Sequence, residues 1–381
     1  MGYLPIFYVF SDIHRTLNCF LLGVQRDWRV DTLRGYFLVV LTIDHLYNPL
    51  RWFTFYTFGY ASSPDGFHLL SGLVTGWVYT RVADRYGAAV VWRKAFRRAA
   101  AIYFARMTIV VACACGGFLP GVHGPHRLWQ TLAAAALVDM HASVGMILSL
   151  YCFFLLFTPL VLSVFETGRA WLVALVSAAL WIAAQLGLGT SAWGLQGFHP
   201  VGFFNIYAWQ AYFVAGLYLG YRIARRGNCG LRRLPWLQLT CALAALSLLV
   251  DRHLALFGRH ALFEFSPDPN HNPARFLDAA CLGYLVWCVP RSVDLKLMKV
   301  GFCRFLNYLG NHSLQVVAFS MVLTRAETHM LTGASGIVRL IVTLMNVAAL
   351  WLPARLHQLW RESQRSHAPA LRLQQATQTS G

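Results

Sequence analysis

Residues 31–50 read DTLRGYFLVVLTIDHLYNPL, an apolar run that carries charged residues near its start and a histidine near its end. If this run is a helix, Arg34 and His45 point the same way within about 20° and lie about 16 Å apart along the axis. Asp31 falls about 40° from His45, on the same face. Ionisable groups are expensive inside a membrane, so this stripe predicts a functional site on a membrane-spanning helix.

The composition of the whole chain places this run in a polytopic membrane protein. The 381 residues are 57% hydrophobic and only 12% charged, whereas a soluble domain has about 25% charged residues. A net charge of +17 is also typical of nucleic-acid-binding proteins. Here the basic residues lie between the hydrophobic runs, so they indicate membrane topology and argue against a nucleic-acid partner.

Hydrophobic runs of membrane-spanning length predict an all-α fold of about ten transmembrane helices embedded in membrane lipids. The predicted spans are 33–50, 66–83, 99–119, 143–165, 170–188, 201–223, 235–256, 274–290, 302–324 and 334–353. The run 128–140 is too short to span easily and is expected to be re-entrant or interfacial.

Basic residues alternate between the loops of this arrangement. They gather in segments 15–29, 85–98, 222–233, 291–299 and 355–372, and Arg169 marks the short link between spans four and five. By the positive-inside rule, both termini are cytoplasmic and His45 faces the outer side. The predicted organisation is a cytoplasmic segment 1–30, a membrane domain 31–354 and a basic, then disordered, tail 355–381.

Histidine and cysteine spacing predicts no metal site and no disulfide framework, because the nine cysteines are scattered through apolar runs. A lone histidine in a membrane helix can simply hydrogen-bond a neighbouring backbone group, but the stripe with Arg34 and Asp31 favours a catalytic role for His45. A histidine titrates near neutral pH and can remove a proton from a sugar hydroxyl that attacks an acyl carbonyl, or it can carry the acyl group itself. The sequence leaves both roles open.

Asp44 is the neighbouring carboxylate that could orient His45. Adjacent helical residues diverge by about 100°, so an Asp44–His45 pair requires the helix to break there. Asn48 and Pro49 follow closely enough to allow such a break. The alternative for Asp44 is a capping or interhelical hydrogen bond.

Arg34 also has two interpretations. It lies three residues after Asp31, a spacing that allows a structural ion pair. It can instead bind a phosphate or carboxylate of a cytoplasmic donor. Further on, Gly72 and Gly76 form a G-x-x-x-G pattern that permits close helix packing.

Polar residues interrupt several later runs, and each needs a structural partner or a substrate. They are Asp65 and Ser71 at the second run, Asn205, Trp209 and Gln210 in the sixth, Asp278 in the eighth, and Asn311, His312 and Ser313 in the ninth. Three consecutive polar residues in the ninth run suggest a kink that lines a cavity.

Four segments, in order, resemble OpgC-type proteins of the acyltransferase 3 group of membrane acyltransferases, over roughly residues 28–325. The first carries an arginine, ten residues and a histidine, matched by Arg34 and His45. The others are 58–72 (FGYASSPDGFHLLSG), 205–210 (NIYAWQ, resembling NPFAWQ) and 309–314 (LGNHSL, resembling LGRHSL). Asp65 stands where glutamate is usual, Ile206 replaces a proline and Asn311 replaces a basic residue. The stretch 270–278 lacks an expected lysine and histidine.

The resemblance implies a multi-pass protein of the inner membrane of a Gram-negative bacterium. It implies succinyl transfer from a cytoplasmic acyl-CoA, such as succinyl-CoA, to osmoregulated periplasmic glucans, with acyl-CoA as cosubstrate and no tightly bound cofactor. The expected catalytic residues are His45, Arg34, Asp44 and Asp31, with Arg34 and Ser71 binding the donor. The expected substrate-binding residues are Asn205, Trp209, Gln210, His312 and Asp65. A homo-oligomer is compatible with the sequence.

Two other classes of function fit the same features. A glycan or anionic-metabolite transporter or flippase would also place charges and helix breaks inside the membrane, although no inverted repeat is apparent. A structural membrane subunit would use the polar stripe to bind a partner helix.

Overall fold

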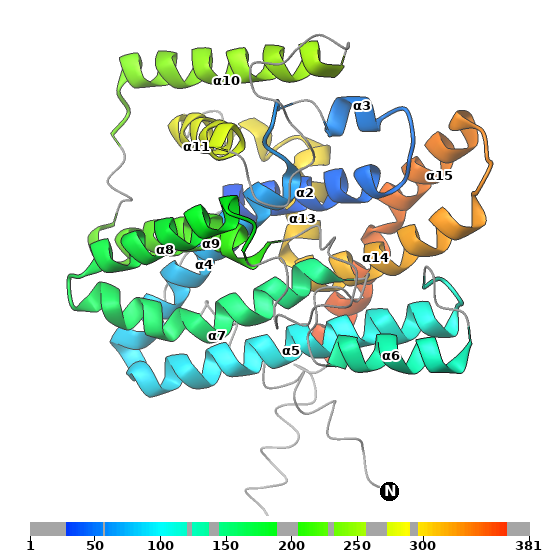
Figure 1. The fold of residues 1–381 in the computed structure, drawn as a ribbon, viewed down its shortest axis with the longest axis horizontal. Helices are drawn as coiled ribbons and strands as arrows, with labels where there is room; N and C mark the ends of the chain where they lie inside the picture. The colour runs from blue at the N-terminus through cyan, green and yellow to red at the C-terminus, as the bar shows by residue number, and fades with distance from the viewer. Residues whose placement is uncertain are drawn as a thin grey trace, which may run out of the picture.

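The computed structural model describes residues 28–55, 58–119, 124–136, 145–188, 205–227, 232–256, 273–289 and 296–363. In these ranges every regular element is a helix, as predicted (Figure 1). The helices are α2 (Trp28–His45), α3 (Arg51–Thr54), α4 (Ser63–Tyr86), α5 (Ala88–Cys115), α6 (Pro125–Ala136), α7 (Met146–Glu166), α8 (Ala170–Gln185), α9 (Ile206–Arg226), α10 (Pro235–Leu256), α11 (Pro273–Cys288), α13 (Gly301–Asn311), α14 (Ser313–Met330) and α15 (Gly336–Ala349).

Four described helices are long and apolar enough to cross a membrane, judged by length and composition. They are Ala88–Cys115, Met146–Glu166, Pro235–Leu254 and Gly336–Ser363, the last being α15 with its helical continuation. Each of the ten predicted spans overlaps at least one helix, but α8 is shorter than these four and α2 carries several charged residues. The number of ten spans remains a prediction.

Large apolar side chains on the outside of the bundle support a membrane location. On α10, Leu239 and Leu243 are 62% and 57% exposed, and Phe157 of α7 and Leu175 of α8 are about as exposed. Contiguous apolar surface of this kind is rare on soluble monomers and suits contact with lipid.

Local sequence explains where the helices begin and end. At the start of α4, the Asp65 carboxylate accepts a hydrogen bond from the Ser62 backbone N–H (2.8 Å) in a capping box. The first helix ends at His45, five residues before the predicted end of span one. Asn48 causes this stop, because its amide donates to the Ile43 carbonyl (2.8 Å) while its Oδ1 accepts from the Leu50 N–H (2.9 Å).

Close packing of α4 on α9 confirms the structural interpretation of the G-x-x-x-G pattern. A Cβ on Gly72 would lie 2.1 Å from the Phe213 carbonyl oxygen, and one on Gly76 would lie 2.2 Å from that of Leu217. A second pair on α9, Gly216 and Gly220, meets α4 in the same way. Small residues let membrane helices approach this closely, and dispersion and packing then hold them together.

The ninth predicted span is divided into two helices at His312, as its polar residues suggested. His312 has φ −117° and ψ 29°, so α13 ends and α14 begins there. The first part, α13, crosses α2 where a Cβ on Gly35 would lie 1.8 Å from the Leu306 carbonyl oxygen. The second part, α14, lies beside α2, and the hydroxyls of Thr42 and Ser320 are hydrogen-bonded at 2.7 Å.

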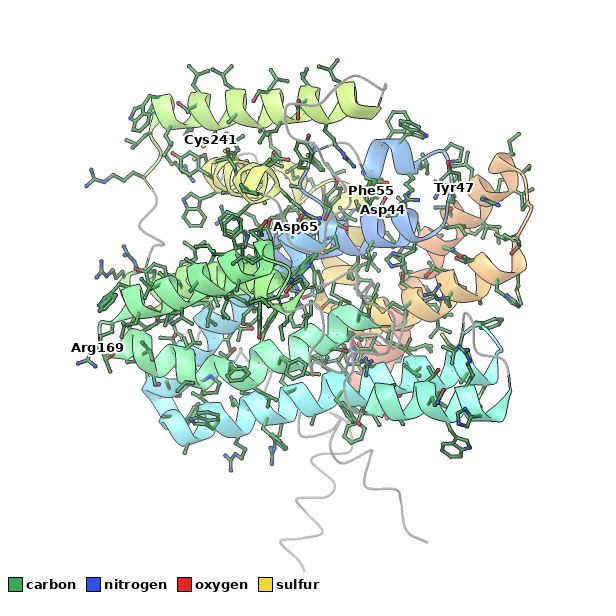
Figure 2. The ribbon with its side chains drawn as sticks, viewed as in Figure 1. Asp44, Tyr47, Phe55, Asp65, Arg169 and Cys241 are labelled. Atoms are coloured by element: carbon green, nitrogen blue, oxygen red, sulfur yellow. The ribbon has the colours of Figure 1, made fainter. Side chains whose placement is uncertain are left out.

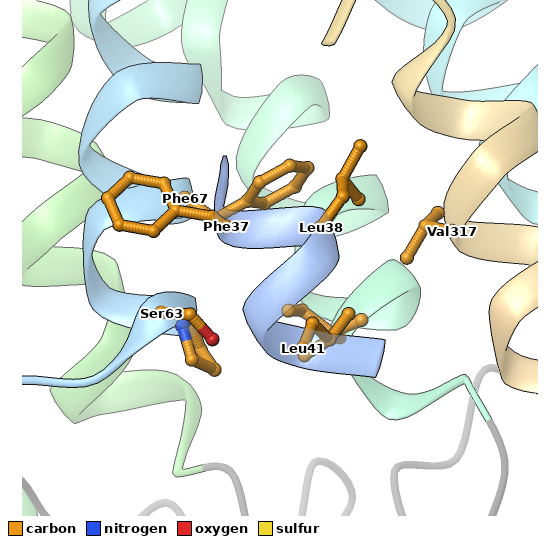
Figure 3. Close-up of a pocket in the computed structure, with 8 residues that line it drawn as sticks. Phe37, Leu38, Leu41, Ser63, Phe67 and Val317 are labelled. Carbon is orange, nitrogen blue, oxygen red and sulfur yellow. The ribbon is translucent and has the colours of Figure 1, made fainter. Parts of the chain in front are cut away.

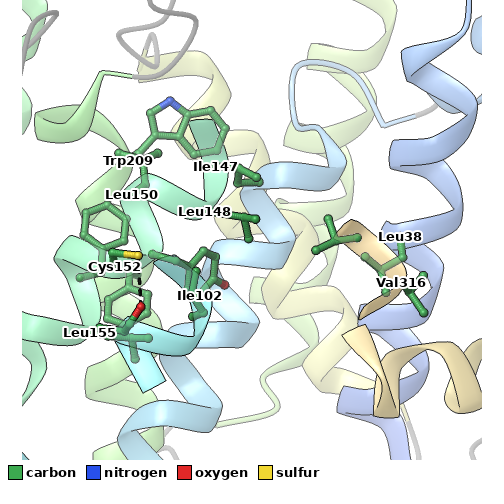
Figure 4. Packing of buried hydrophobic residues seen from close by; sticks show 14 of the residues in the cluster. Leu38, Ile102, Ile147, Leu148, Leu150, Cys152, Leu155, Trp209 and Val316 are labelled. Carbon is green, nitrogen blue, oxygen red and sulfur yellow. Dashed lines mark hydrogen bonds between the residues drawn. The ribbon is translucent and has the colours of Figure 1, made fainter. Parts of the chain in front are cut away.

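The buried core connects α2, α4, α5, α7, α9 and α14, and Figure 4 shows part of it around Ile102, Leu150 and Trp209. Leu150 is fully buried and Trp209 is 1% exposed. This apolar packing fixes the helices on which the polar residues of the site stand.

Several helix ends meet at two opposite ends of the bundle (Figure 1). At one end, here named the Arg225 end, Arg225 of α9 bridges Asp84 of α4 (2.6 Å) and Glu166 of α7 (2.5 Å). The other is named the His45 end, where Phe118 after α5 contacts His329 of α14 with ring centroids 6.0 Å apart. Figure 2 shows Arg169 at the opposite side of the molecule from Asp44 and Tyr47.

Candidate active site

Arg34 lies where α2, α4 and α14 meet. Its Nη2 donates to the Ser313 hydroxyl (2.8 Å), and its guanidinium carbon is 5.8 Å from the centroid of the Phe67 ring. Arg98 of α5 is within electrostatic range of Arg34 and of Tyr151. Two guanidinium groups near each other favour an anionic ligand.

His45 is the last residue of α2, and its side chain is exposed. Its Nδ1 lies 2.6 Å from the Leu41 carbonyl oxygen. A carbonyl oxygen only accepts, so Nδ1 carries the hydrogen and Nε2 keeps the lone pair in the neutral ring. Nε2 is therefore the ring nitrogen that can accept a proton.

The two carboxylates predicted beside this pair have separate environments. Helix α2 continues through His45, and the Asp44 carboxylate accepts a hydrogen bond from the Thr54 hydroxyl (2.5 Å). Asp44 thus connects α3 to α2, which is the interhelical hydrogen bond considered as its alternative role. Asp31 is 5% exposed and lies at the crossing with α13, where Gly310 approaches its carbonyl oxygen.

An apolar seam lies along α2 between Arg34 and His45. Figure 3 shows Phe37, Leu38 and Leu41 of α2 facing Phe67 and Val317 around a cavity of ≈ 10 Å³. This volume suits about one water molecule. The space is too small for an acyl group, so passage along this face of α2 requires the helices to separate.

Asp65 forms a buried ion pair with Arg275 of α11. Arg275 Nε lies 3.0 Å from Asp65 Oδ2, and its Nη2 lies 3.1 Å from Oδ1 and 2.6 Å from the Ser62 hydroxyl. The exposed fractions of the Arg275 and Asp65 side chains are 8% and 1%. The protein itself therefore occupies both oxygens of Asp65, which was predicted to bind substrate.

Aromatic rings connect this ion pair to the surroundings of Arg34. Trp209 lies between the Arg275 guanidinium, 5.5 Å from a ring centroid, and the His68 ring at 4.9 Å. His68 stacks on Tyr151 (5.2 Å), which interacts with Ser71. The structure thus brings Trp209, Ser71 and Asp65 into one buried region.

Asn205 and Gln210 are bound by neighbouring protein groups. The Asn205 side chain caps α9 by accepting from the Tyr207 N–H (2.9 Å) and donates to the Leu188 carbonyl (2.7 Å). Gln210 accepts from the Ser177 hydroxyl and donates to the Ser177 carbonyl, both at 2.9 Å. These contacts join α8 to α9.

His312 lies at the break between α13 and α14, away from His45. Its Nδ1 is 2.8 Å from Nδ1 of His357, in the helix that continues α15. Tyr308 packs on the His312 ring with centroids 5.2 Å apart. This histidine pair joins the two C-terminal helices.

A second buried cluster of polar residues, Tyr60, Asp251 and Asp278, connects the segment before α4 to α10 and α11. Asp278 Oδ2 accepts hydrogen bonds from the backbone N–H groups of Tyr60 (2.8 Å) and Ala61 (2.9 Å). The Tyr60 hydroxyl donates to Asp251 of α10 (2.6 Å). Burial and the hydrogen bond to Asp251 raise the pKa of the Tyr60 phenol above its usual range, so it stays protonated and holds α10 in place.

Sequence reasoning missed Arg275, His357 and the role of His68. Arg275 opens an otherwise apolar helix, and a lone arginine there implies a carboxylate partner. His68 and His357 carry no local signal, since their partners come from helices distant in sequence. In the described ranges, no group of three or more His, Cys, Asp or Glu residues is arranged to hold a metal ion.

Comparison with known proteins gives one match. A family model described as OpgC protein matches residues 26–362. No curated protein and no solved structure gives a match.

Proposed function

Since the chain belongs to the OpgC family, whose members modify osmoregulated periplasmic glucans by acyl transfer, we propose that it is a membrane O-acyltransferase. In this proposal it moves a succinyl group from succinyl-CoA to hydroxyls of a periplasmic glucan. The protein crosses the inner membrane of a Gram-negative bacterium, with the Arg225 end in the cytoplasm and the His45 end facing the periplasm. Acyl-CoA is the cosubstrate.

The proposal depends above all on the pair of residues on α2. His45 is exposed and its Nδ1 is bound to the Leu41 carbonyl, so Nε2 is available as a base. Arg34 is eleven residues earlier and is held by Ser313 and Phe67. One helix thus carries both a base and a cation that suits an anionic donor.

The chemistry follows from these two groups. His45 Nε2 accepts the proton of a glucan hydroxyl as that oxygen attacks the thioester carbonyl. An ester C–O bond forms, the C–S bond breaks, and the proton passes from His45 to the departing CoA thiolate. Arg34 lies about 16 Å from His45 along the helix axis, and in this mechanism it binds a phosphate of the donor by paired N–H donors while the thioester reaches His45. Transfer through an acyl-histidine is the alternative route.

The first prediction concerns His45. His45→Ala in folded, membrane-inserted protein should lower acyl transfer by about 10²- to 10⁴-fold, because general bases contribute about that much. The assay incubates purified protein in nanodiscs with periplasmic glucan and succinyl-CoA or acetyl-CoA, and measures the mass gain of the glucan by mass spectrometry.

His253 provides a matched control for this experiment. It makes the same bond to the carbonyl four residues earlier (Nδ1 to Leu249, 2.9 Å) but stands on the peripheral helix α10. His253→Ala should transfer at the wild-type rate. Unchanged transfer by His45→Ala would contradict the mechanism, and wild-type protein that leaves the mass of the glucan unchanged with every donor would favour the transporter.

A further inference from the structure

A groove lined by aromatic, apolar and charged residues opens at the His45 end, two residues beyond His45 along the chain. Its volume is ≈ 370 Å³, within the range of about 300–1,000 Å³ that is typical of small-molecule sites. It is named here the Tyr47 groove. Its lining residues are Tyr47, Asn48, Pro49, Arg51, Trp52, Ala334, Gly336 and Arg339.

The walls of the Tyr47 groove are held by specific hydrogen bonds. Asn48 fixes the turn after α2 by bonding to both Ile43 and Leu50, and Thr54 of α3 is bound to Asp44. The opposite wall is the N-terminus of α15, which Ser335 caps. The groove is therefore built by ordered segments from both ends of the sequence.

Charge and aromatic surface are combined in this groove. Tyr47 is 70% exposed, and the guanidinium carbons of Arg51 and Arg339 lie 5.8 and 6.0 Å from its ring centroid. Trp52 adds a second exposed aromatic ring. In the described part of the chain, no salt bridge joins a carboxylate to Arg51 or Arg339. Asp44 lies within electrostatic range of Arg51, and its carboxylate accepts a hydrogen bond from Thr54.

The two kinds of group recognise different parts of a ligand. Exposed aromatic rings give rigid apolar faces that suit the C–H face of a sugar ring. Arginine provides a planar fork that binds a carboxylate through two parallel hydrogen bonds. A neutral glucan would use only the aromatic rings, and the two arginines would keep only their contacts within the protein, such as the hydrogen bond from Arg339 to the Leu331 carbonyl (3.4 Å).

We propose that the Tyr47 groove is a subsite for an anionic carbohydrate, namely a glucan that already carries carboxylate substituents. This inference rests on the proposed function, because each succinyl transfer adds one free carboxylate to the glucan. An acylated sugar unit bound by Arg51 and Arg339 holds a neighbouring unit close to His45. The groove therefore favours repeated acylation of one glucan molecule.

Binding measured without acyl donor tests this subsite separately from catalysis. The probes are a β-glucan oligosaccharide and the same oligosaccharide after chemical succinylation, titrated calorimetrically into protein in phosphatidylcholine nanodiscs. Wild-type protein should bind the succinylated probe about tenfold more tightly at low salt. Arg339→Gln and Arg51→Gln should each remove most of this preference, and Tyr47→Ala should weaken binding of both probes.

Arg127 of α6 offers the matched control, because it is an exposed arginine outside the groove. Arg127→Gln should retain the wild-type preference. Equal affinity of wild-type protein for the two probes would overturn the proposal. So would loss of the preference in nanodiscs that contain phosphatidylglycerol, since the arginines would then be a lipid site. A protein that prefers the succinylated probe but transfers no acyl group would refute the proposed function and leave the subsite intact.

Discussion

At the scale of single residues, most polar groups of the predicted site are bound by other parts of the chain. Asp65, Asn205 and Gln210 have their polar atoms bound by other parts of the chain. His45 is exposed with Nδ1 fixed, and Arg34 is held at a helix junction. In the proposed mechanism, Asp65, Asn205 and Gln210 therefore position helices, and His45 and Arg34 perform the chemistry.

The Asp65–Arg275 pair gives a prediction about stability. Arg275→Leu leaves the buried Asp65 carboxylate without its cation and should lower the free energy of unfolding by about 3–5 kcal/mol. The double variant Asp65→Leu/Arg275→Leu removes both charges and should recover much of this loss. Denaturant titration of the variants in one detergent measures both effects, and losses that simply add would contradict a direct ion pair.

Sequence reasoning at this scale succeeded where the signal was local. Helical phase predicted that Arg34 and His45 share a face of one helix, and the continuous helix α2 preserves that register. The partners Ser313 and Arg275 are more than 200 residues away from Arg34 and Asp65 in sequence. No periodicity within one segment predicts such pairs, because they depend on how the helices pack.

At the scale of helices, backbone contact holds the centre of the molecule together. Paired glycines on α4 and α9 allow contact between main chains, and Gly35 and Gly310 do the same between α2 and α13. These crossings fix α4, which carries Asp65 and Ser71, against α9, which carries Trp209. The geometry of the buried polar region therefore depends on residues that have no polar side chain.

Gly76→Ala tests the contact between α4 and α9. The added Cβ would lie 2.2 Å from a backbone oxygen, so the helices must separate, and the variant should lose about 1–3 kcal/mol of stability. Gly283→Ala on α11 is the control, because its Cβ would meet only Leu69 Cδ2, at 3.6 Å. That variant should be neutral or stabilised by up to about 1 kcal/mol. Equal melting temperatures for the two variants would show that the crossing is not tight.

Some helix ends and breaks could be predicted from the sequence, and others could not. The G-x-x-x-G pattern and the polar residues at 311–313 correctly indicated close packing and a break. The predicted span ran to Leu50 because apolar residues continue that far, although Asn48 and Pro49 allowed an earlier break. The Asn48 side-chain hydrogen bonds that end α2 at His45 are visible only in three dimensions.

At the scale of the whole molecule, the two ends differ in chemistry. At the Arg225 end, Arg225 of α9 connects the ends of α4 and α7 through ion pairs. Its hydrogen bond to Glu166 raises the pKa of Arg225. The His45 end carries His45 and the Tyr47 groove.

The basic loops of the sequence predicted that α4, α7 and α9 all end on one side of the membrane. The ion pairs of Arg225, which connect these three helices, agree with that prediction. Which helices are neighbours was not predictable, because loop charge carries no information about lateral packing.

The orientation of these ends in the membrane is the last prediction. Arg169 is exposed near the Arg225 end and Arg127 is exposed on α6, which packs beside the final part of α5 (Figure 1). The positive-inside rule assigns Arg169 to the cytoplasm and hence Arg127 to the periplasm. In a variant without other cysteines, Arg127→Cys should react with a membrane-impermeant maleimide on intact spheroplasts, whereas Arg169→Cys should react only after permeabilisation. The reverse pattern would place His45 and the Tyr47 groove in the cytoplasm, where they could not acylate a periplasmic glucan, so this labelling decides the direction of the proposed reaction.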